Sequence, residues 1–199
     1  MVVSKHTNSI FNSNTYLIED KVYNYCWLID VGDTNWILNS SFLIKGVLLT
    51  HSHYDHIYGL PKLLYAFPDC KIITNQHGKE ALGDDKLNMS RYHDNSIIVK
   101  NDNIICYKDG DEIELFDNVA FRIYETPGHN PSCLTYLCDD YIFTGDSYIP
   151  GIKVVTNLPK GNKIQAQESL NKIQTLMGNR TICPGHGEMV KGERCYPYR

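Results

Sequence analysis

The chain has 199 residues, of which 42% are hydrophobic and 21% charged, and its formal net charge is −4. These values are typical of a soluble globular protein, and we predict a single domain over residues 1–199. The acidic balance argues against a nucleic-acid partner, because nucleic-acid-binding domains usually carry a basic surface. No apolar stretch approaches the ~20 residues that a membrane helix needs, so no membrane partner is expected.

The start of the chain and its cysteines indicate a cytoplasmic protein. Residues 1–14 lack the apolar stretch and the cleavage-site pattern of a secretory signal peptide. The seven cysteines are odd in number and irregularly spaced, which is typical of reduced thiols rather than of a disulfide framework. The oligomeric state stays open at this point.

Short apolar runs predict many strands and three helices. The predicted strands are residues 15–19, 25–31, 42–50, 71–74, 104–107, 112–115, 119–125, 134–138, 141–143 and 180–183. The run Val47-Leu48-Leu49 is typical of a strand that is covered on both faces. This pattern predicts sheets covered by helices, with both α/β and hairpin character.

The predicted helices are residues 60–67, 76–82 and 163–177. The last of them is the clearest, because Asn162 and Gln165 resemble a capping box at its start and Gly178 suits its end. The polar stretch 84–103 fits neither a helix nor a strand. It could form a flap near a functional site.

Four of the six residues that follow the third predicted strand can bind a metal ion. They are His51, His53, Asp55 and His56, and imidazole nitrogens and carboxylate oxygens are common zinc ligands. On an extended strand end, residues 51 and 53 point to the same side and could hold one metal. Asp55 and His56 follow where the chain turns towards a helix, and they could face a second metal nearby.

Three further segments offer one ligand each in a tight turn after a strand: Thr126-Pro127-Gly128-His129, Thr144-Gly145-Asp146-Ser147 and Pro184-Gly185-His186-Gly187. A polar loop with surface histidines is the alternative interpretation of the first cluster, and these segments argue against it. The remaining histidines (His6, His77 and His93) lie in polar stretches, and we expect them outside the site.

The segments THSHYDH, TPGH, TGDS and PGHG, in this order, resemble the motifs of the metallo-β-lactamase superfamily. The resemblance extends from position 30 to position 187. It implies an α/β, four-layer αββα sandwich with a two-metal site at one edge of the β-sandwich.

The resemblance also implies a role for each ligand. His51, His53 and His129 would hold the first metal, Asp55, His56 and His186 the second, and Asp146 would bridge the two. Asp30, in LIDVG, resembles an early Asp of the family and would orient ligands through hydrogen bonds; the alternative for it is a turn residue at a strand end. The metals would be two divalent ions, most simply Zn²⁺, with Fe or Mn as alternatives. The family's TPGHTPGS is TPGHNPSC here, and neither Asn130 nor Cys133 is an expected ligand.

Such a centre would act as a hydrolase, with a hydroxide shared by the two metals as the nucleophile and Asp55 as the catalytic residue that orients it. Residues 146–153 and 157–162 resemble the glyoxalase II branch, which hydrolyses thioesters such as hydroxyacylglutathione. The helical glutathione-binding region of that branch is not found after His186, so we favour a small thioester, ester or lactone as the substrate. Secreted β-lactamases of the family resemble the chain less well, because they carry Cys at the position of Asp146 and lack His56.

Three alternatives stay open. A phosphodiesterase or ribonuclease of the same fold would show a basic groove. An iron-dependent sulfur dioxygenase would hold iron and consume oxygen. A non-enzymatic metal-binding module would not need so complete a set of ligands.

Overall fold

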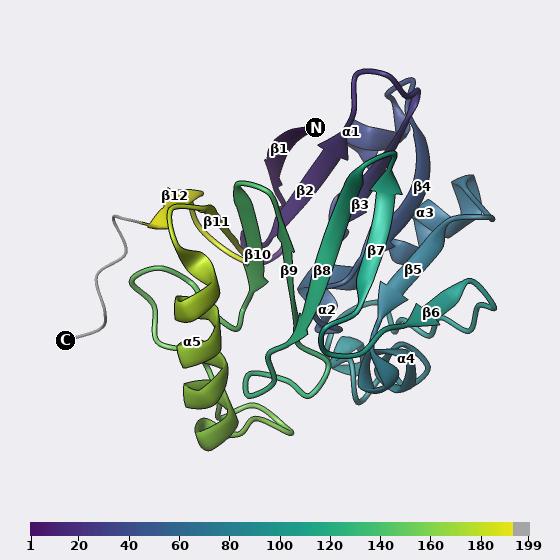
Figure 1. Cartoon of the computed structure of the whole chain (residues 1–199). Coiled ribbons are helices and arrows are strands. Elements are labelled where there is room, and N and C mark those ends of the chain that lie inside the picture. Colours follow the sequence, from purple (N-terminus) through teal and green to yellow (C-terminus); the bar gives the residue numbers. More distant parts are fainter. Residues whose placement is uncertain (193–199) are drawn as a thin grey trace.

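Two mixed six-stranded sheets pack face to face in the computed structural model, which describes residues 1–192 (Figure 1). The first sheet has the order β1 (Val2–Thr7), β2 (Asn14–Glu19), β3 (Tyr25–Ile29), β4 (Leu43–Leu48), β5 (Lys71–Thr74), β6 (Ile104–Cys106). The second has the order β12 (Val190–Lys191), β11 (Thr181–Pro184), β10 (Tyr141–Gly145), β9 (Leu134–Cys138), β8 (Val119–Glu125), β7 (Glu112–Phe116). Each sheet is therefore built from one continuous part of the chain.

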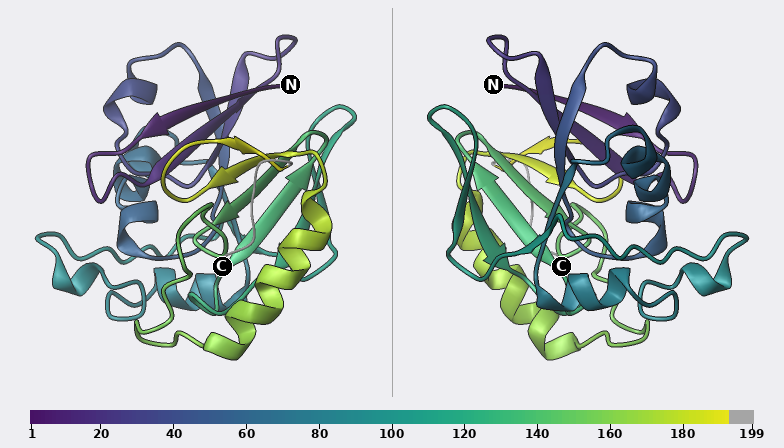
Figure 2. Two further views of the ribbon diagram at one scale, coloured as in Figure 1. Left: turned by 90° about the vertical axis from the view of Figure 1, so that its left-hand side faces the viewer. Right: turned by 90° about the vertical axis from the view of Figure 1, so that its right-hand side faces the viewer.

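Helices cover the outer face of each sheet (Figure 2). The first sheet is covered by α1 (Asn35–Leu38), α2 (Tyr54–Ile57), α3 (Leu60–Ala66) and α4 (Gln76–Leu82). The second is covered by α5 (Lys163–Met177), whose Ile173 and Met177 pack against Ile142 and Ile182. The side chain of Asn162 accepts hydrogen bonds from the amides of residues 164 and 165 at the start of this helix, as the sequence predicts.

The alternation of side chains along β3 shows how one strand serves two cores. Cys26 and Leu28 pack among the helices on the outer face. Trp27 and Ile29 point the other way, into the core between the two sheets, where they join Phe121 and other residues of the second sheet. Successive side chains of a strand face opposite sides of a sheet, so a fully apolar strand fits only where both faces are covered. This αββα arrangement confirms the predicted fold class.

The predicted strands and helices are all present, with small shifts at their ends. The strand β4 ends at Leu48, two residues earlier than predicted, so His51 and His53 lie in a loop rather than at the end of a strand. The sequence pattern missed β1, α1, α2 and β12. The strand β1 is half exposed at a sheet edge, and the other three have four residues or fewer, too few for a periodicity to show.

Two further findings concern the helices and the cysteines. None of the helices within residues 1–192 has the length and apolar character needed to span a bilayer. The cysteines of the same residues are all free: Cys26, Cys70, Cys106, Cys133, Cys138 and Cys183. The seventh, Cys195, lies outside the described residues.

Candidate metal centre

All seven predicted ligands gather at the edge of the sandwich where β4, β8, β10 and β11 end. Their nitrogen and oxygen atoms form three groups, in each of which the ligand atoms lie within 4.8 Å of one another. The groups are His51, His53 and His129; His51, His56 and Asp146; and Asp55, His56 and His186. The first sheet and its loops thus contribute four of these side chains and the second sheet contributes three.

The first group is buried, and the pKa values of two of its histidines are lowered. Nδ1 of His53 lies 2.9 Å from Nε2 of His129, and all three histidines are at most 5% exposed. Burial, together with the nearby His129, lowers the pKa of His53 to about 3. Burial, together with His56 and His53, also lowers the pKa of His51. Neutral imidazole is the form that binds a metal ion.

The third group, of Asp55, His56 and His186, includes a carboxylate and is more open. Nε2 of His56 lies 3.4 Å from Oδ2 of Asp55 and 3.4 Å from Nε2 of His186. Burial opposes a charge on His56, but Asp55, Asp30 and Asp146 together raise its pKa well above the usual value. Burial likewise opposes a charge on His186, but hydrogen bonds with Asp146 and Asp55 raise its pKa to about 9. The side chain of His186 is 21% exposed, so the centre opens to solvent on this side.

Asp146 lies between the first group and the third. Its Oδ2 lies 3.6 Å from Nε2 of His129, and its Oδ1 lies 3.7 Å from Nε2 of His56. Residue 185 must be a glycine here, because a Cβ atom on it would lie 2.0 Å from Oδ1 of Asp146. Oδ2 also lies 3.5 Å from Nε2 of His186, so the carboxylate approaches histidines of both groups.

Two buried polar atoms of the centre lack a hydrogen-bond partner within the described chain. They are Nε2 of His51 and Oδ1 of Asp146. Buried polar atoms are nearly always paired in native proteins, and both of these atoms carry lone pairs suited to a cation. The residues at this edge therefore fit a bound metal ion.

Asp30 lies beneath the ligands and forms hydrogen bonds with Thr50 and His56. Its Oδ1 accepts a hydrogen bond from the amide of Thr50 at 2.7 Å. Its Oδ2 accepts from the Thr50 hydroxyl at 2.6 Å and faces Nδ1 of His56 at 2.8 Å. The residue is buried and has φ 55°, a strained conformation that tertiary contacts must maintain. These are the hydrogen bonds expected of a ligand-orienting carboxylate.

Several groups that orient the histidines could not be predicted from the sequence. The carbonyl of Phe11 lies 3.1 Å from Nδ1 of His186, and the carbonyl of Val155 lies 2.8 Å from Nδ1 of His129. Backbone carbonyls leave no mark in a sequence. Thr50, whose hydroxyl lies 3.2 Å from Nδ1 of His51, could have been found, because it stands directly before the first ligand.

The other three histidines lie outside these ligand groups. His6 stacks on Trp36 with ring centroids 4.7 Å apart, and His77 lies on α4. His93 follows the 3₁₀ turn Ser90–Tyr92 in the otherwise irregular segment 84–103, and its ring stacks on Tyr54 of α2. The segment that the sequence left unassigned therefore contacts the helix that carries Asp55 and His56.

The family model of the metallo-beta-lactamase superfamily matches residues 42–186, which is well over half of the chain. A hydroxyacylglutathione hydrolase of Hamiltonella defensa is 26% identical over 189 residues, covering 91% of this chain and 65% of that protein. The chain thus spans less than two thirds of that relative.

Two solved structures show the same fold at lower identity. BLEG-1, a B3 metallo-beta-lactamase, superposes with a TM-score of 0.84 at 21% identity, covering 97% of this chain and 95% of that one. TTHA1623 in a di-iron-bound form superposes with a TM-score of 0.79 at 23% identity, covering 98% and 99%. The family match, the shared αββα architecture and the His-rich metal site at the sheet edge agree with the hydrolase class predicted from the sequence. The chain belongs to the metallo-beta-lactamase superfamily.

Proposed function

We propose that the chain is a binuclear metal-dependent hydrolase that cleaves a small thioester, ester or lactone. The observation that carries this proposal is the pair of unpartnered buried atoms, Nε2 of His51 and Oδ1 of Asp146, whose residues belong to one ligand group together with His56. A core that only needed to be stable would not leave both atoms without a partner.

The ligands divide into two sets in this proposal. His51, His53 and His129 hold the first metal, and Asp55, His56 and His186 hold the second. Asp146 would serve both metals, because its carboxylate approaches His129 of the first set and His56 and His186 of the second. We favour zinc for both ions, because nitrogen and carboxylate ligands suit it. The di-iron form of TTHA1623 supports a two-metal centre and keeps iron as an alternative to zinc.

When bound, two divalent ions lower the pKa of a water molecule to near neutrality and polarise the oxygen of the group under attack. The side chains of the chain position the reactants. Asp55, which is 14% exposed at the open side, accepts a hydrogen bond from the attacking water and orients it towards the substrate. Asp30 holds His56 through its Nδ1, so that the ring keeps its place during the reaction.

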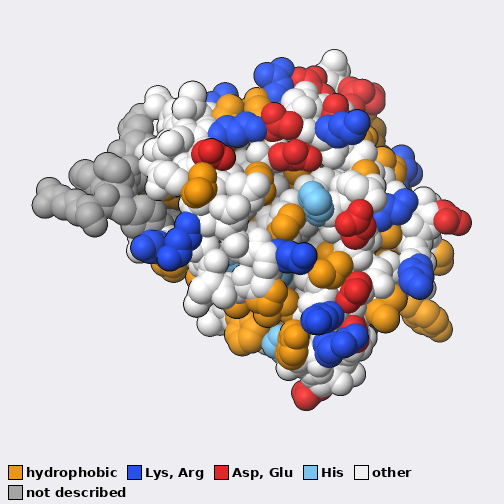
Figure 3. Space-filling model, turned by 90° about the horizontal axis from the view of Figure 1, so that it is seen from below, with side chains coloured by type: hydrophobic (Ala, Val, Ile, Leu, Met, Phe, Trp, Pro, Cys, Tyr) orange, Lys and Arg blue, Asp and Glu red, His pale blue; other side chains and the backbone are white. Residues whose placement is uncertain are grey.

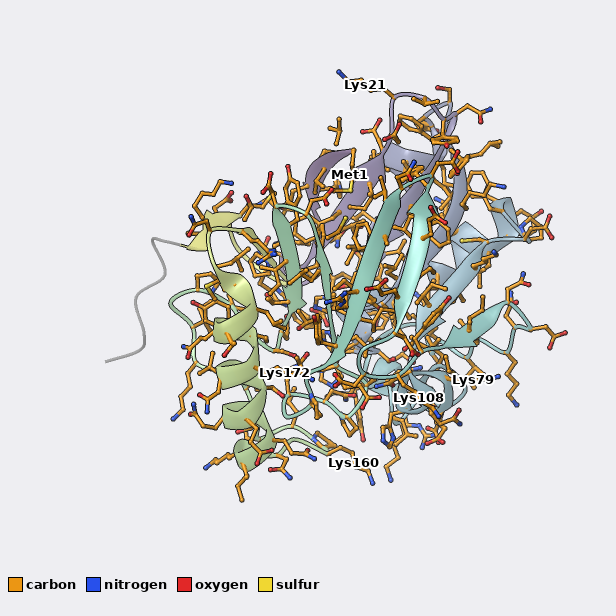
Figure 4. The ribbon with its side chains drawn as sticks, viewed as in Figure 1. Met1, Lys21, Lys79, Lys108, Lys160 and Lys172 are labelled. Atoms are coloured by element: carbon orange, nitrogen blue, oxygen red, sulfur yellow. The ribbon has the colours of Figure 1, made fainter. Side chains whose placement is uncertain are left out.

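The substrate class rests on the relatives and on the surroundings of the first set. The relative of Hamiltonella defensa carries the name hydroxyacylglutathione hydrolase, which supports a thioester. A cavity of about 290 Å³ lies beside the first set and is lined by Asn130, Pro131, His77 and Lys160, among others. Lys160 makes no ion pair with another described residue and lies at the lower end of the molecule (Figure 4). It is suited to an anionic arm of the substrate.

The face of the molecule at this end combines apolar and charged side chains. Seen from below, exposed hydrophobic side chains and histidines lie among lysine, arginine and acidic side chains (Figure 3). Such a mixed surface suits a small substrate with both apolar and anionic parts better than a long polyanion, which would need an extended basic groove.

Metal analysis and a hydrolase panel test the proposal together. Protein purified without added metal should contain close to two equivalents of metal per chain. It should hydrolyse at least one thioester, ester or lactone and consume no oxygen. A metal content near zero that added zinc does not restore would refute the binuclear centre. Two equivalents of iron with oxygen consumption would instead identify a dioxygenase, and cleavage of a phosphodiester alone would identify a nuclease-type enzyme.

A further inference from the structure

Asn14, the first residue of β2, makes three hydrogen bonds with the turn that carries His186. Its backbone amide donates to the carbonyl of Gly185 at 2.7 Å. Its side-chain nitrogen Nδ2 donates to the carbonyl of Pro184 at 3.0 Å and to that of Gly187 at 2.9 Å. The carbonyls on both sides of His186 are therefore held by one residue of the other sheet.

The side-chain NH₂ group of Asn14 joins two points of this turn that no other described side chain joins. Backbone carbonyls can only accept, so the NH₂ group and not the oxygen must face them. Each carbonyl has a second donor: the Tyr16 hydroxyl for Pro184 at 2.7 Å and the Lys5 ammonium for Gly187 at 2.9 Å. Loss of the NH₂ group would therefore leave neither carbonyl without a partner. It would remove the one group that fixes the two carbonyls relative to each other.

His186 depends on its backbone more than the other members of its ligand set do. Its side chain is 21% exposed, against 14% for Asp55 and 0% for His56, so packing restrains it least. The residue before Asn14 acts on the same set. Ser13 pairs with His186 through an isolated antiparallel bridge, and its hydroxyl donates to the carbonyl of Asp55 at 2.7 Å. Residues 13 and 14 thus connect the segments of Asp55 and His186, which belong to different sheets.

We propose that Asn14 is a positioning residue of the second metal site, which fixes the turn 184–187 so that His186 stays beside Asp55 and His56. The inference rests on the ligand assignment of the proposed function. Ligand atoms bind zinc within a narrow range of distances, roughly 2.0–2.2 Å for nitrogen and oxygen. A turn that can shift therefore lowers the affinity of the second site. The first ligand set contains no residue of this turn, so the first site is unaffected.

The variant Asn14→Leu tests the proposal on the full-length protein. Leucine has the same branched shape and the same number of side-chain heavy atoms but no donor, and the backbone hydrogen bond of residue 14 is kept. We expect the zinc affinity of the second site to fall by roughly 10–100-fold, the scale of ligand-orienting partners, with the first site unchanged. Competition with a chelator measures both affinities. An equal loss at both sites, or no loss at either, would overturn the proposal.

A double-mutant cycle with His186→Ala separates positioning from a general loosening of the fold. Residues that act through one another have non-additive effects, whereas independent residues have additive ones. We expect Asn14→Leu to change the second-site zinc affinity much less in the His186→Ala background than in the wild type. Additive losses would show that Asn14 does not act through His186, and the proposal would be wrong.

Asn88→Leu is the matched control. Asn88 is 0% exposed and Asn14 is 1% exposed. The side-chain nitrogen of Asn88 also donates to two backbone carbonyls, those of Ala81 at 3.0 Å and Ile97 at 2.9 Å, but neither carbonyl belongs to a turn that carries a ligand. We expect this variant to lose thermal stability without a selective loss of the second metal. A second-site loss as large as that of Asn14→Leu would contradict the proposal.

Thermal unfolding of the metal-free variants checks that they fold. If Asn14→Leu does not, Asn14→Asp provides the same measurement, because an ionised carboxylate cannot donate either. Its negative charge would attract a cation, so weaker zinc binding would come from the lost donor and not from the charge. A wild type that binds no zinc would refute the ligand assignment and this inference with it. A wild type that binds two ions, with an Asn14 variant that binds both as tightly, would refute only the role of Asn14.

Discussion

The imidazole of His93 stacks on the ring of Tyr54, with centroids 4.0 Å apart and an interplanar angle of 9°. Phe11 meets the same imidazole edge-on at 5.8 Å. Tyr54 begins α2, the helix that carries two proposed ligands of the second metal, and the carbonyl of Phe11 faces His186. His93 therefore connects the irregular segment 84–103 to both sides of the second metal site.

Replacing His93 should weaken the second metal without removing the first. An aromatic pair contributes about 0.5–1.5 kcal/mol, so we expect His93→Ala to lower the affinity of the second site by roughly twofold to tenfold. Zinc titration with a competing chelator measures both sites. His77→Ala is the control, because His77 makes no ring contact among the described residues. Equal behaviour of the two variants would show that the stack does not support the site.

Asp55 should matter more for turnover than for the first metal. The change Asp55→Asn keeps the volume and one oxygen but removes the charge. We expect a weaker second metal and hydrolysis slower by at least ~10²-fold, a scale typical of losing general acid–base help. The comparison is His53→Ala, which should empty the first site, because two histidines and a bridging carboxylate hold a metal poorly. Full activity of Asp55→Asn would contradict the assigned roles.

Thr50 should support the first metal through its hydroxyl alone. Thr50→Val keeps the shape but leaves Nδ1 of His51 without its acceptor, so we expect the first-site zinc affinity to fall by roughly 10–100-fold. Thr74→Val offers a matched control, because Thr74 is also buried and its hydroxyl has no hydrogen-bond partner among residues 1–192. Thermal unfolding of both metal-free variants checks that the folds are intact. An unchanged zinc affinity in Thr50→Val would show that the Thr50 hydroxyl does not support metal binding by His51.

Lys160 should affect the recognition of anionic substrates. We expect Lys160→Ala to raise KM for a carboxylate-bearing thioester by about two- to fivefold, since an exposed ion pair contributes ~0.2–1 kcal/mol. KM for a neutral thioester and kcat for both should stay unchanged. Lys21→Ala removes the same charge at the opposite end of the molecule (Figure 4). A similar rise in KM for both variants would point to net charge rather than to a contact.

The sequence was most informative where a local pattern reflects a local structure. The ligand segment 51–56 and the three Gly-containing turns mark strand ends, and strand ends converge at a sheet edge. The apolar runs at positions 26–29 and 47–49 likewise reflect coverage on both faces. Prediction failed where the structure depends on distant contacts. No pattern in residues 84–103 reveals that His93 stacks on Tyr54.

The roles of single polar residues divide in the same way. Asp30 could be proposed because the segment LIDVG resembles a motif of the family. Asn130 was noticed only as a departure from a familiar motif. Its contact with His53 depends on the fold and on the hydrogen bonds that its side chain makes with Ser132. Phe11 and Val155 orient His186 and His129 through their backbone carbonyls, which a residue of any type could provide.

The two sheets come from successive parts of the chain, residues 2–106 and residues 112–191, and this division passes through the metal centre. The set of His51, His53 and His129 takes two side chains from the first part and one from the second. The set of Asp55, His56 and His186 is divided in the same proportion. Neither half of the chain can therefore complete a metal site by itself. A metal that binds only the assembled sandwich stabilises it by mass action. The bound ions would thus stabilise the packing of the two sheets at the edge where the core between them ends.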